Sequence, residues 1–201
     1  MIALIDYGMG NLRSVEKALE EAGARVRRVD SAAGLTRARA IVLPGVGAYG
    51  DAVSELRRRG LHASVRDAVR SGTPYLGLCL GLQLLFESSE ESPGVRGLGL
   101  LKGRVVRFRG RLKVPHMGWN DIQRSGRPKL LSGIKDGTYY YFVHSYYAVP
   151  EDPGCLAATT FYGTRICAAV ESGSIWATQF HPEKSQSQGL RLLRNFVRTV
   201  S

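Results

Sequence analysis

A cysteine near the middle of the chain has the surroundings of a catalytic nucleophile. Gly77 and Gly81 flank Cys79 at two residues on each side, as in the Gly-x-Ser-x-Gly elbow of hydrolases, with sulfur in place of the hydroxyl oxygen. Such a turn passes sharply from a strand into a helix, and Cβ atoms at the flanking positions would clash with neighbouring backbone. The helix N-terminus also favours the thiolate. Cys79 is therefore a candidate nucleophile, although a small core cysteine fits the same local pattern.

A candidate base and its orienting group follow near the C-terminus. His181 and Glu183 stand on either side of Pro182, directly after the apolar run that ends at Phe180. In extended backbone, residues i and i+2 point to the same side, and a proline helps to hold this geometry. A carboxylate beside a histidine fixes the imidazole tautomer and stabilises the imidazolium. His181 can then deprotonate Cys79, with Glu183 orienting the ring.

The stretch Pro44-Gly45-Val46-Gly47 provides a candidate oxyanion site. It follows the apolar run 40–43, and its glycines allow backbone N–H groups to converge on an anion. A tetrahedral intermediate needs two such donors. The elbow geometry makes the N–H of Leu80 the first donor, and the second is expected from Gly45, Val46 or Gly47. An ordinary connection between a strand and a helix is the alternative interpretation.

The periodicity of apolar residues predicts the elements that position these groups. The short continuous apolar runs are typical of strands buried in a parallel sheet, and they lie at 2–6, 40–43, 75–78 and 175–180. Helical periodicity follows a cap at Asn11 and a cap at Asp51, and recurs at 61–70 and 190–200. From Gly97 the pattern changes to short alternating strands, expected at 104–109, 115–122, 139–148, 156–162 and 165–171.

These elements predict an α/β fold in one domain over residues 1–201. A central, mostly parallel sheet is flanked by helices, and an antiparallel β-rich segment has hairpin turns at Gly110 and at Tyr162-Gly163. In open α/β sheets, ligands bind beyond the carboxyl ends of the strands. The elbow, the glycine loop and His181 all follow strand ends, so we expect them to share one site.

The composition restricts the classes of protein that fit. The chain has 201 residues, of which 44% are hydrophobic and 22% charged, as in ordinary folded domains. No apolar run approaches the roughly 20 residues that span a membrane, and the N-terminus lacks the basic segment of a signal peptide. The three cysteines, Cys79, Cys155 and Cys167, have no paired spacing, which argues against disulfides. We therefore expect a cytoplasmic protein without membrane contact.

Cofactor and metal signals are weak. Gly8-x-Gly10 follows the first strand, but Arg13 stands where a dinucleotide fingerprint needs its third glycine. Cys79, His181 and Glu183 are nominal zinc ligands, yet a glycine-flanked cysteine in a turn is a poor rigid ligand. We expect neither a cofactor nor a metal.

The formal charge of +11 raises the question of a nucleic-acid partner. Six Lys and Arg residues between positions 102 and 113 alternate with apolar residues, which favours a strand pair with a cationic outer face. Only Phe108 among them offers a ring for base stacking, so no nucleic-acid partner is expected. Of the other histidines, His62 and His116 are expected at the surface or in loops. His144 is expected to be packed and hydrogen-bonded within an aromatic strand.

The segments 77–83 and 179–183, which read Gly-Leu-Cys-Leu-Gly-Leu-Gln and Gln-Phe-His-Pro-Glu, resemble the motifs of class I (triad) glutamine amidotransferases. The resemblance extends over essentially the whole chain. It implies a flavodoxin-like fold and hydrolysis of glutamine through Cys79, His181 and Glu183. It also implies that the amino-acid end of glutamine is held by Gln83, Glu91, Ser145 and Tyr146. The carboxylate of Glu91 is chemically suited to an α-ammonium group.

Three further stretches, at 44–47, 115–120 and 140–146, resemble one branch of this family, the glutaminase subunits of a two-subunit enzyme of histidine biosynthesis. The resemblance implies a heterodimer with a (β/α)₈-barrel cyclase subunit that receives the ammonia. It also implies that Asn11, Trp119 and Lys184 lie at the interface, on loops at the edge of the active site.

One departure from the wider family affects the expected activity. Many class I members carry a Gly-Gly-Pro oxyanion loop, whereas Val46 lies within the loop here. We expect the isolated chain to be a poor glutaminase until its partner acts on this loop. Two alternatives stay open from the residues: a stand-alone cysteine hydrolase of γ-glutamyl bonds, and a non-catalytic basic module that binds nucleic acid.

Overall fold

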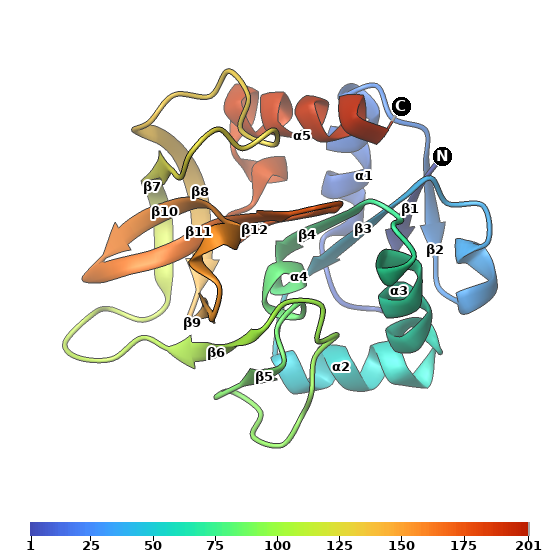
Figure 1. Ribbon diagram of the computed structural model, residues 1–201, viewed down its shortest axis with the longest axis horizontal. Coiled ribbons are helices and arrows are strands. Elements are labelled where there is room, and N and C mark those ends of the chain that lie inside the picture. The colour runs from blue at the N-terminus through green and yellow to red at the C-terminus, as the bar shows by residue number, and fades with distance from the viewer. Residues whose placement is uncertain (201) are drawn as a thin grey trace.

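The computed structural model describes residues 1–200, and its centre is a nine-stranded mixed sheet (Figure 1). The strand order is β2-β1-β3-β4-β12-β11-β10-β7-β8. The parallel part consists of β1 Ile2–Ile5, β2 Val26–Val29, β3 Ala40–Gly45, β4 Tyr75–Cys79 and β12 Ile175–Thr178. The apolar runs that predict buried parallel strands are therefore in the predicted places.

Helices cover both faces of the parallel part (Figure 1). Two of them lie on one face, α1 Leu12–Glu21 and α5 Gln186–Val200, and two on the other, α2 Tyr49–Arg58 and α3 Leu61–Arg70. Successive residues of the strands alternate between the two layers. Leu4 and Val42 pack in the core under α1 and α5, whereas Ala3 and Ile41 pack in the core under α2 and α3. This two-sided burial explains why β1, β3 and β4 are continuously apolar, whereas the edge strand β2 carries exposed Arg27 and Arg28.

The antiparallel part extends the same sheet and adds a smaller one. The added strands are β7 His116–Arg124, β8 Thr138–His144, β10 Leu156–Tyr162 and β11 Thr164–Ser172. The smaller sheet has the order β5-β6-β9, with β5 Ser88–Ser89, β6 Gly103–Arg107 and β9 Tyr146–Pro150. The remaining short elements are α4 Leu80–Gln83 and three 3₁₀ helices, Ala32–Leu35, Pro153–Cys155 and Pro182–Lys184.

The predicted strand at 139–148 is divided at Ser145. Residues up to His144 belong to β8 in the large sheet, and residues from Tyr146 belong to β9 in the small sheet. The chain thus crosses from one sheet to the other at a single residue. An alternating apolar pattern continues through both strands, so nothing in the pattern marks the crossing.

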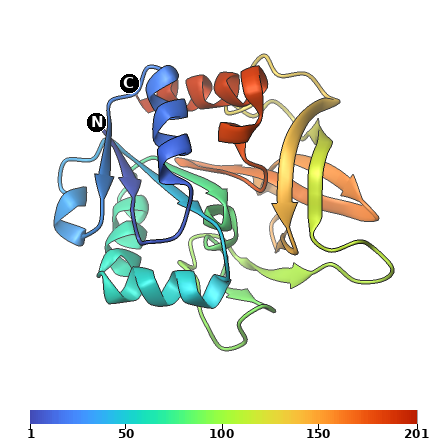
Figure 2. The same cartoon turned by 180° about the vertical axis from the view of Figure 1, so that it is seen from behind.

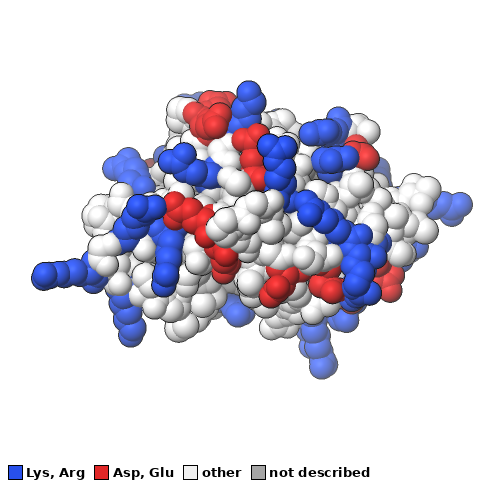
Figure 3. Space-filling view, turned by 90° about the horizontal axis from the view of Figure 1, so that it is seen from below, with Lys and Arg blue, Asp and Glu red and all other residues white. Residues whose placement is uncertain are grey.

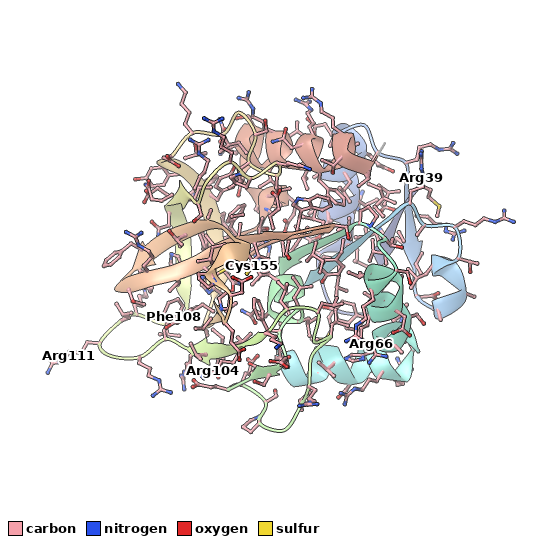
Figure 4. The ribbon with its side chains drawn as sticks, viewed as in Figure 1. Arg39, Arg66, Arg104, Phe108, Arg111 and Cys155 are labelled. Carbon is pink, nitrogen blue, oxygen red and sulfur yellow. The ribbon has the colours of Figure 1, made fainter. Side chains whose placement is uncertain are left out.

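The predicted hairpin turn at Gly110 is wrong, whereas the turn at Tyr162-Gly163 does join the paired strands β10 and β11. β6 and β7 lie in different sheets, and the loop between them extends away from the body (Figures 1 and 2). Arg111 projects at the tip of this loop, while Phe108 lies near its start (Figure 4). The cations beyond Arg107 therefore lie on a loop and not on the predicted strand.

The predicted cap of α2 by Asp51 is also wrong. The helix begins at Tyr49, and its first backbone amides donate to side chains from a distant segment. Tyr49 N lies 2.8 Å from Glu91 Oε2, and Gly50 N lies 3.0 Å from Ser92 Oγ. These long-range acceptors replace a local cap, so the helix can start earlier than the local sequence indicates.

Among the described residues, no helix is both long enough and apolar enough to cross a membrane. On the face shown in Figure 3, Lys and Arg side chains are spread from one end to the other, with Asp and Glu between them. The positive charge on this face is thus distributed and does not form one continuous patch.

The elbow glycines can be tested by adding one methyl group. A Cβ at Gly81 would overlap the carbonyl oxygen of Leu43. We expect Gly81→Ala to lower the free energy of unfolding by about 3 kcal/mol or more, because backbone must move to admit it. Gly94→Ala is the control: its Cβ meets nothing within 4 Å, and its φ of +81° costs about 1 kcal/mol. If urea unfolding gives the same loss of free energy of unfolding for Gly81→Ala and Gly94→Ala, the close backbone approach at the elbow is refuted.

Candidate active site

Cys79 ends β4 and immediately precedes α4. Its φ of 54° and ψ of −104° are strained for a residue with a side chain, as is common for a nucleophile in an elbow. A Cβ at Gly77 would lie 2.5 Å from the carbonyl oxygen of Gly81, so the predicted need for small residues is met by a close backbone approach. α4 has only four residues and is shorter than the predicted helix, so its dipole contributes less than expected.

His181 and Glu183 form a buried pair beyond the end of β12. His181 Nδ1 lies 2.8 Å from Glu183 Oε1, and each side chain is only 3% exposed. Because a carboxylate accepts, Nδ1 carries the hydrogen and the pair fixes the orientation of the ring. No described residue makes a hydrogen bond to His181 Nε2, so this nitrogen is free for proton exchange with the thiol.

Electrostatics couple His181 to Cys79. Burial by itself would lower the pKa of His181, but the charge of the nearby Cys79 thiolate and the hydrogen bond to Glu183 raise it well above the ordinary value. When Cys79 is ionised, His181 therefore holds its proton at neutral pH. The three side chains can act as a nucleophile, a base and an orienting carboxylate.

A pocket of about 340 Å³ lies beside Cys79. It brings together most of the residues predicted for the oxyanion and the substrate, and its lining includes Val46, Gly47, Leu80, Gln83, Glu91, Ser145 and Tyr146. Gly45 does not line the pocket, but it pairs with Cys79 across β3 and β4. A Cβ at Gly45 would overlap the hydroxyl of Tyr7, so this position also requires glycine.

Gln83 uses its amide nitrogen to hold the pocket wall. Nε2 donates to the carbonyl of Tyr146 at 2.9 Å and to Gln179 Oε1 at 3.2 Å. The amide of Gln179 in turn lies 3.8 Å from Cys79 Sγ, and this thiol also faces the carbonyl of Val143 at 3.9 Å. Gln179 was not predicted as a site residue, although its place two residues before His181 at the end of β12 is a usable signal.

Glu91 lines the pocket while also capping α2. One of its oxygens accepts from Tyr49 N, and no described residue donates to the other. The predicted role in binding an α-ammonium group is compatible with this arrangement. The hydrogen bond to the start of α2 also fixes the position of the Glu91 carboxylate, whereas the carboxylate of a free surface glutamate would not be held in place.

The predicted interface residues lie on different elements. Asn11 caps α1 and accepts from Ser14 N at 3.4 Å. Trp119 is 47% exposed and lies within β7, so its predicted place on a loop is wrong. Tyr141 links it to Lys184, because its ring lies 6.2 Å from that of Trp119 and 5.8 Å from Lys184 Nζ.

The histidine predictions are right for one residue and wrong for another. His144 is buried and hydrogen-bonded at the end of β8, as predicted. His116 was expected at the surface or in a loop, but it lies in β7, is 3% exposed and contacts His144. The strand predicted at 115–122 does include this position, so the error concerns the burial of the side chain. His62 is half-buried on α3, with Nε2 3.1 Å from the carbonyl oxygen of Gly97.

Comparison with known proteins agrees with the fold. The sequence model of the family described as glutamine amidotransferase class-I matches residues 3–200. A solved structure titled as a glutamine amidotransferase superposes with a TM-score of 0.78 at 22% identity, covering 100% of this chain and 99% of its own. The structure of PurLQS from Thermotoga maritima gives a TM-score of 0.77, also at 22% identity, covering 100% and 98%.

The chain belongs to the class I glutamine amidotransferases, and the predicted fold class is confirmed. Curated relatives named imidazole glycerol phosphate synthase subunit HisH are similar over nearly their full length. The relative from Rhodopirellula baltica is 50% identical, covering 98% of this chain and 97% of its own, and that from Syntrophotalea carbinolica is 51% identical, covering 98% of each. Within the class, this is therefore a glutaminase subunit of histidine biosynthesis, the branch that the sequence motifs indicate.

Among the described residues, no group of three or more His, Cys, Asp and Glu side chains is arranged to hold a metal ion.

Removing the charge of Glu183 tests the pair. The charge of Glu183 raises the pKa of His181, so Glu183→Gln lowers that pKa and shifts the alkaline limb of the kcat/KM pH profile to lower pH. A glutamine amide also favours the wrong tautomer, and we expect kcat for glutamine hydrolysis to fall by roughly 10²–10⁴-fold. Glu183→Asp keeps the charge and should lose less. An unshifted alkaline limb in Glu183→Gln would show that Glu183 does not act on His181.

Proposed function

We propose that the chain hydrolyses glutamine to glutamate and ammonia through a glutamyl thioester on Cys79. The ammonia passes to a (β/α)₈-barrel cyclase subunit, which makes imidazole glycerol phosphate and AICAR. The observation that carries this proposal is the buried His181–Glu183 pair, electrostatically coupled to a strained cysteine that opens on a pocket. The HisH relatives support the subunit role and the pathway.

The first half of the reaction forms the thioester. The Cys79 sulfur attacks the carboxamide carbon of glutamine, and the negative oxygen is met by the N–H of Leu80 and by a second N–H from Gly45, Val46 or Gly47. His181 delivers its Nε2 proton to the departing nitrogen, and the C–N bond breaks. Ammonia leaves, while Cys79 stays acylated.

The second half releases glutamate. His181, now neutral, takes a proton from water, and the hydroxide attacks the thioester carbon. The C–S bond breaks, and the sulfur leaves as a thiolate beside the reformed imidazolium. Glu183 stabilises that imidazolium in both halves, because its Oε1 holds Nδ1–H throughout.

The oxyanion loop is the part most accessible to a partner. Val46 is 42% exposed at the edge of the pocket, and Gly47 has a φ of +93°. A loop with a flexible glycine and an exposed side chain can change the direction of its N–H groups without disturbing the core. This supports the expectation that the isolated chain is a poor glutaminase.

The outer face of β7 and β8 supports a large protein partner. Its exposed apolar side chains include Met117 at 62%, Trp119 at 47% and Tyr139 at 57%. These strands stand at one end of the large sheet (Figures 1 and 2). Contiguous exposed apolar residues are typical of protein interfaces, where aromatic residues dominate the binding free energy. Met117 and Tyr139 extend the interface beyond the predicted residues.

Ammonia is useful only when an acceptor receives it before it protonates and escapes. We therefore expect a heterodimer in the cytoplasm, with glutamine as the small-molecule substrate and without a membrane or nucleic-acid partner. The spread of charge on the face in Figure 3 supports the last point, since nucleic-acid sites concentrate cations. A stand-alone γ-glutamyl hydrolase is the competing function.

A glutaminase assay tests the function directly. We expect slow turnover of glutamine by the chain alone and at least tenfold faster turnover with the cyclase and its nucleotide ligand. Cys79→Ala should abolish both rates, because the glutamyl thioester needs the Cys79 sulfur. High turnover without the cyclase, or hydrolysis of γ-glutamyl peptides, would favour the stand-alone hydrolase. Activity retained in Cys79→Ala would refute the proposed mechanism.

Truncation of Trp119 tests the interface. Replacing a central interface tryptophan with alanine typically costs about 2 kcal/mol, so we expect the Kd for the cyclase to rise by roughly 30-fold. Lys184→Ala should weaken binding less. The matched control is Arg66→Ala, which removes a half-buried cation from α3, on another part of the molecule (Figure 4). Unchanged calorimetric affinity in Trp119→Ala would place the interface elsewhere.

A further inference from the structure

We propose that His116 and His144 are positioning residues for glutamine binding: two neutral imidazoles, joined nitrogen to nitrogen, hold the pocket wall formed by Ser145 and Tyr146. This inference deepens the proposed function and rests on it. Neither histidine belongs to the predicted triad, oxyanion loop or substrate set.

A continuous line of hydrogen bonds joins β7 to the pocket. His144 Nδ1 lies 2.9 Å from the carbonyl oxygen of Tyr146, and His144 Nε2 lies 2.9 Å from His116 Nδ1. On the far side, Asn120 Nδ2 lies 3.2 Å from His116 Nε2. His144 itself lines the pocket, so the line ends at the wall that glutamine must contact.

The groups at the two ends of this line of hydrogen bonds determine which nitrogen donates and which accepts at every step. A carbonyl only accepts, so His144 Nδ1 must carry a hydrogen, and Nε2 of the neutral ring then accepts from His116 Nδ1. His116 Nε2 is left as an acceptor for the Asn120 amide. The amide is itself oriented, since Nδ2 also donates to the carbonyl of Phe161 at 3.0 Å and Oδ1 accepts from Asp121 N at 2.9 Å. Both histidines are thereby fixed as Nδ1–H tautomers.

The surroundings keep both rings neutral. His116 is stacked between Phe142, at 4.9 Å, and Tyr162, at 4.1 Å, and Phe108 packs 5.3 Å from His144 (Figure 4 shows Phe108). Burial lowers the pKa of His116 to about 4 and that of His144 to about 3. A proton on either ring would place two donors against each other, so neutrality is required for the line to hold.

The wall held by this line faces the candidate nucleophile. The Tyr146 carbonyl accepts from Gln83 as well as from His144, and Gln83 connects through Gln179 toward Cys79 Sγ. Without His116, His144 loses the partner that fixes its Nδ1–H tautomer, and its Nε2–H tautomer cannot donate to this carbonyl, so one of the two bonds on the carbonyl is lost. The wall then loses order where the amino-acid end of glutamine is expected, while the His181–Glu183 pair keeps its own separate bond. The effect should therefore fall on KM and not on kcat.

The variant His116→Phe removes both hydrogen bonds while keeping a ring between Phe142 and Tyr162. In the cyclase-bound enzyme, we expect KM for glutamine to rise at least tenfold, with kcat within threefold of wild type. His116→Asn is the matched control, because its amide nitrogen takes the place of Nδ1 and still donates to His144. It should recover most of the loss. Thermal unfolding of the same samples checks that the fold is retained.

Nitrogen NMR of the wild-type chain measures which ring nitrogens of the two histidines carry hydrogen, without any substitution. We expect protonated Nδ1 and unprotonated Nε2 in both His116 and His144, a tautomer that free histidine disfavours. An Nε2–H tautomer at His144, an unchanged KM in His116→Phe, or equal losses of kcat in both variants would overturn the proposal. Absence of glutaminase activity in wild type would instead refute the proposed function, and the tautomers would still be measurable.

Discussion

The close approach of β3, β4 and α4 is the constraint on which the site depends. Gly81 lies so close to the carbonyl of Leu43, and Gly77 to that of Gly81, that no side chain fits at either glycine. This contact holds Cys79 at a positive φ, a conformation that costs on the order of 1–3 kcal/mol. The buried parallel strands β3 and β12 on both sides of β4 hold the backbone in place there, and their packing offsets the strain. The oxyanion loop after β3 and His181 beyond β12 consequently meet Cys79 at one sheet edge.

The second half of the pocket depends on the crossing at Ser145. Because β8 and β9 belong to different sheets, the backbone between them is not held by a regular ladder on both sides. Polar side chains do this instead: His144 and Gln83 both bond the Tyr146 carbonyl, and Glu91 is fixed by the start of α2. A satisfied buried polar network of this kind specifies one arrangement, and a partly satisfied one is costly.

The sequence was informative wherever the determining contacts are local. The elbow is predicted from the glycines two residues on each side of Cys79. The His181–Glu183 contact is predicted from extended backbone, and the common position of the site residues is predicted from the apolar runs that precede them. Errors occur where a partner distant in sequence decides the outcome. Glu91 caps α2 from 42 residues away, His144 buries His116 from 28 residues away, and β6 pairs with β9 instead of forming a hairpin at Gly110. No local pattern contains those partners.

The side chains proposed for catalysis are buried, whereas the residues that a partner can reach are exposed. His181 and Glu183 are buried and bonded to each other, so a partner binding at the surface has little means to alter them. Val46 and Trp119 are exposed, and each lies on an element that leads into the site: the oxyanion loop, and strand β7, which carries His116 and Asn120. A cyclase subunit that docks on these elements can therefore aim the oxyanion donors and support the pocket wall without moving the triad. In the proposed function, regulation by the partner acts on transition-state stabilisation and substrate binding, while the nucleophile stays assembled.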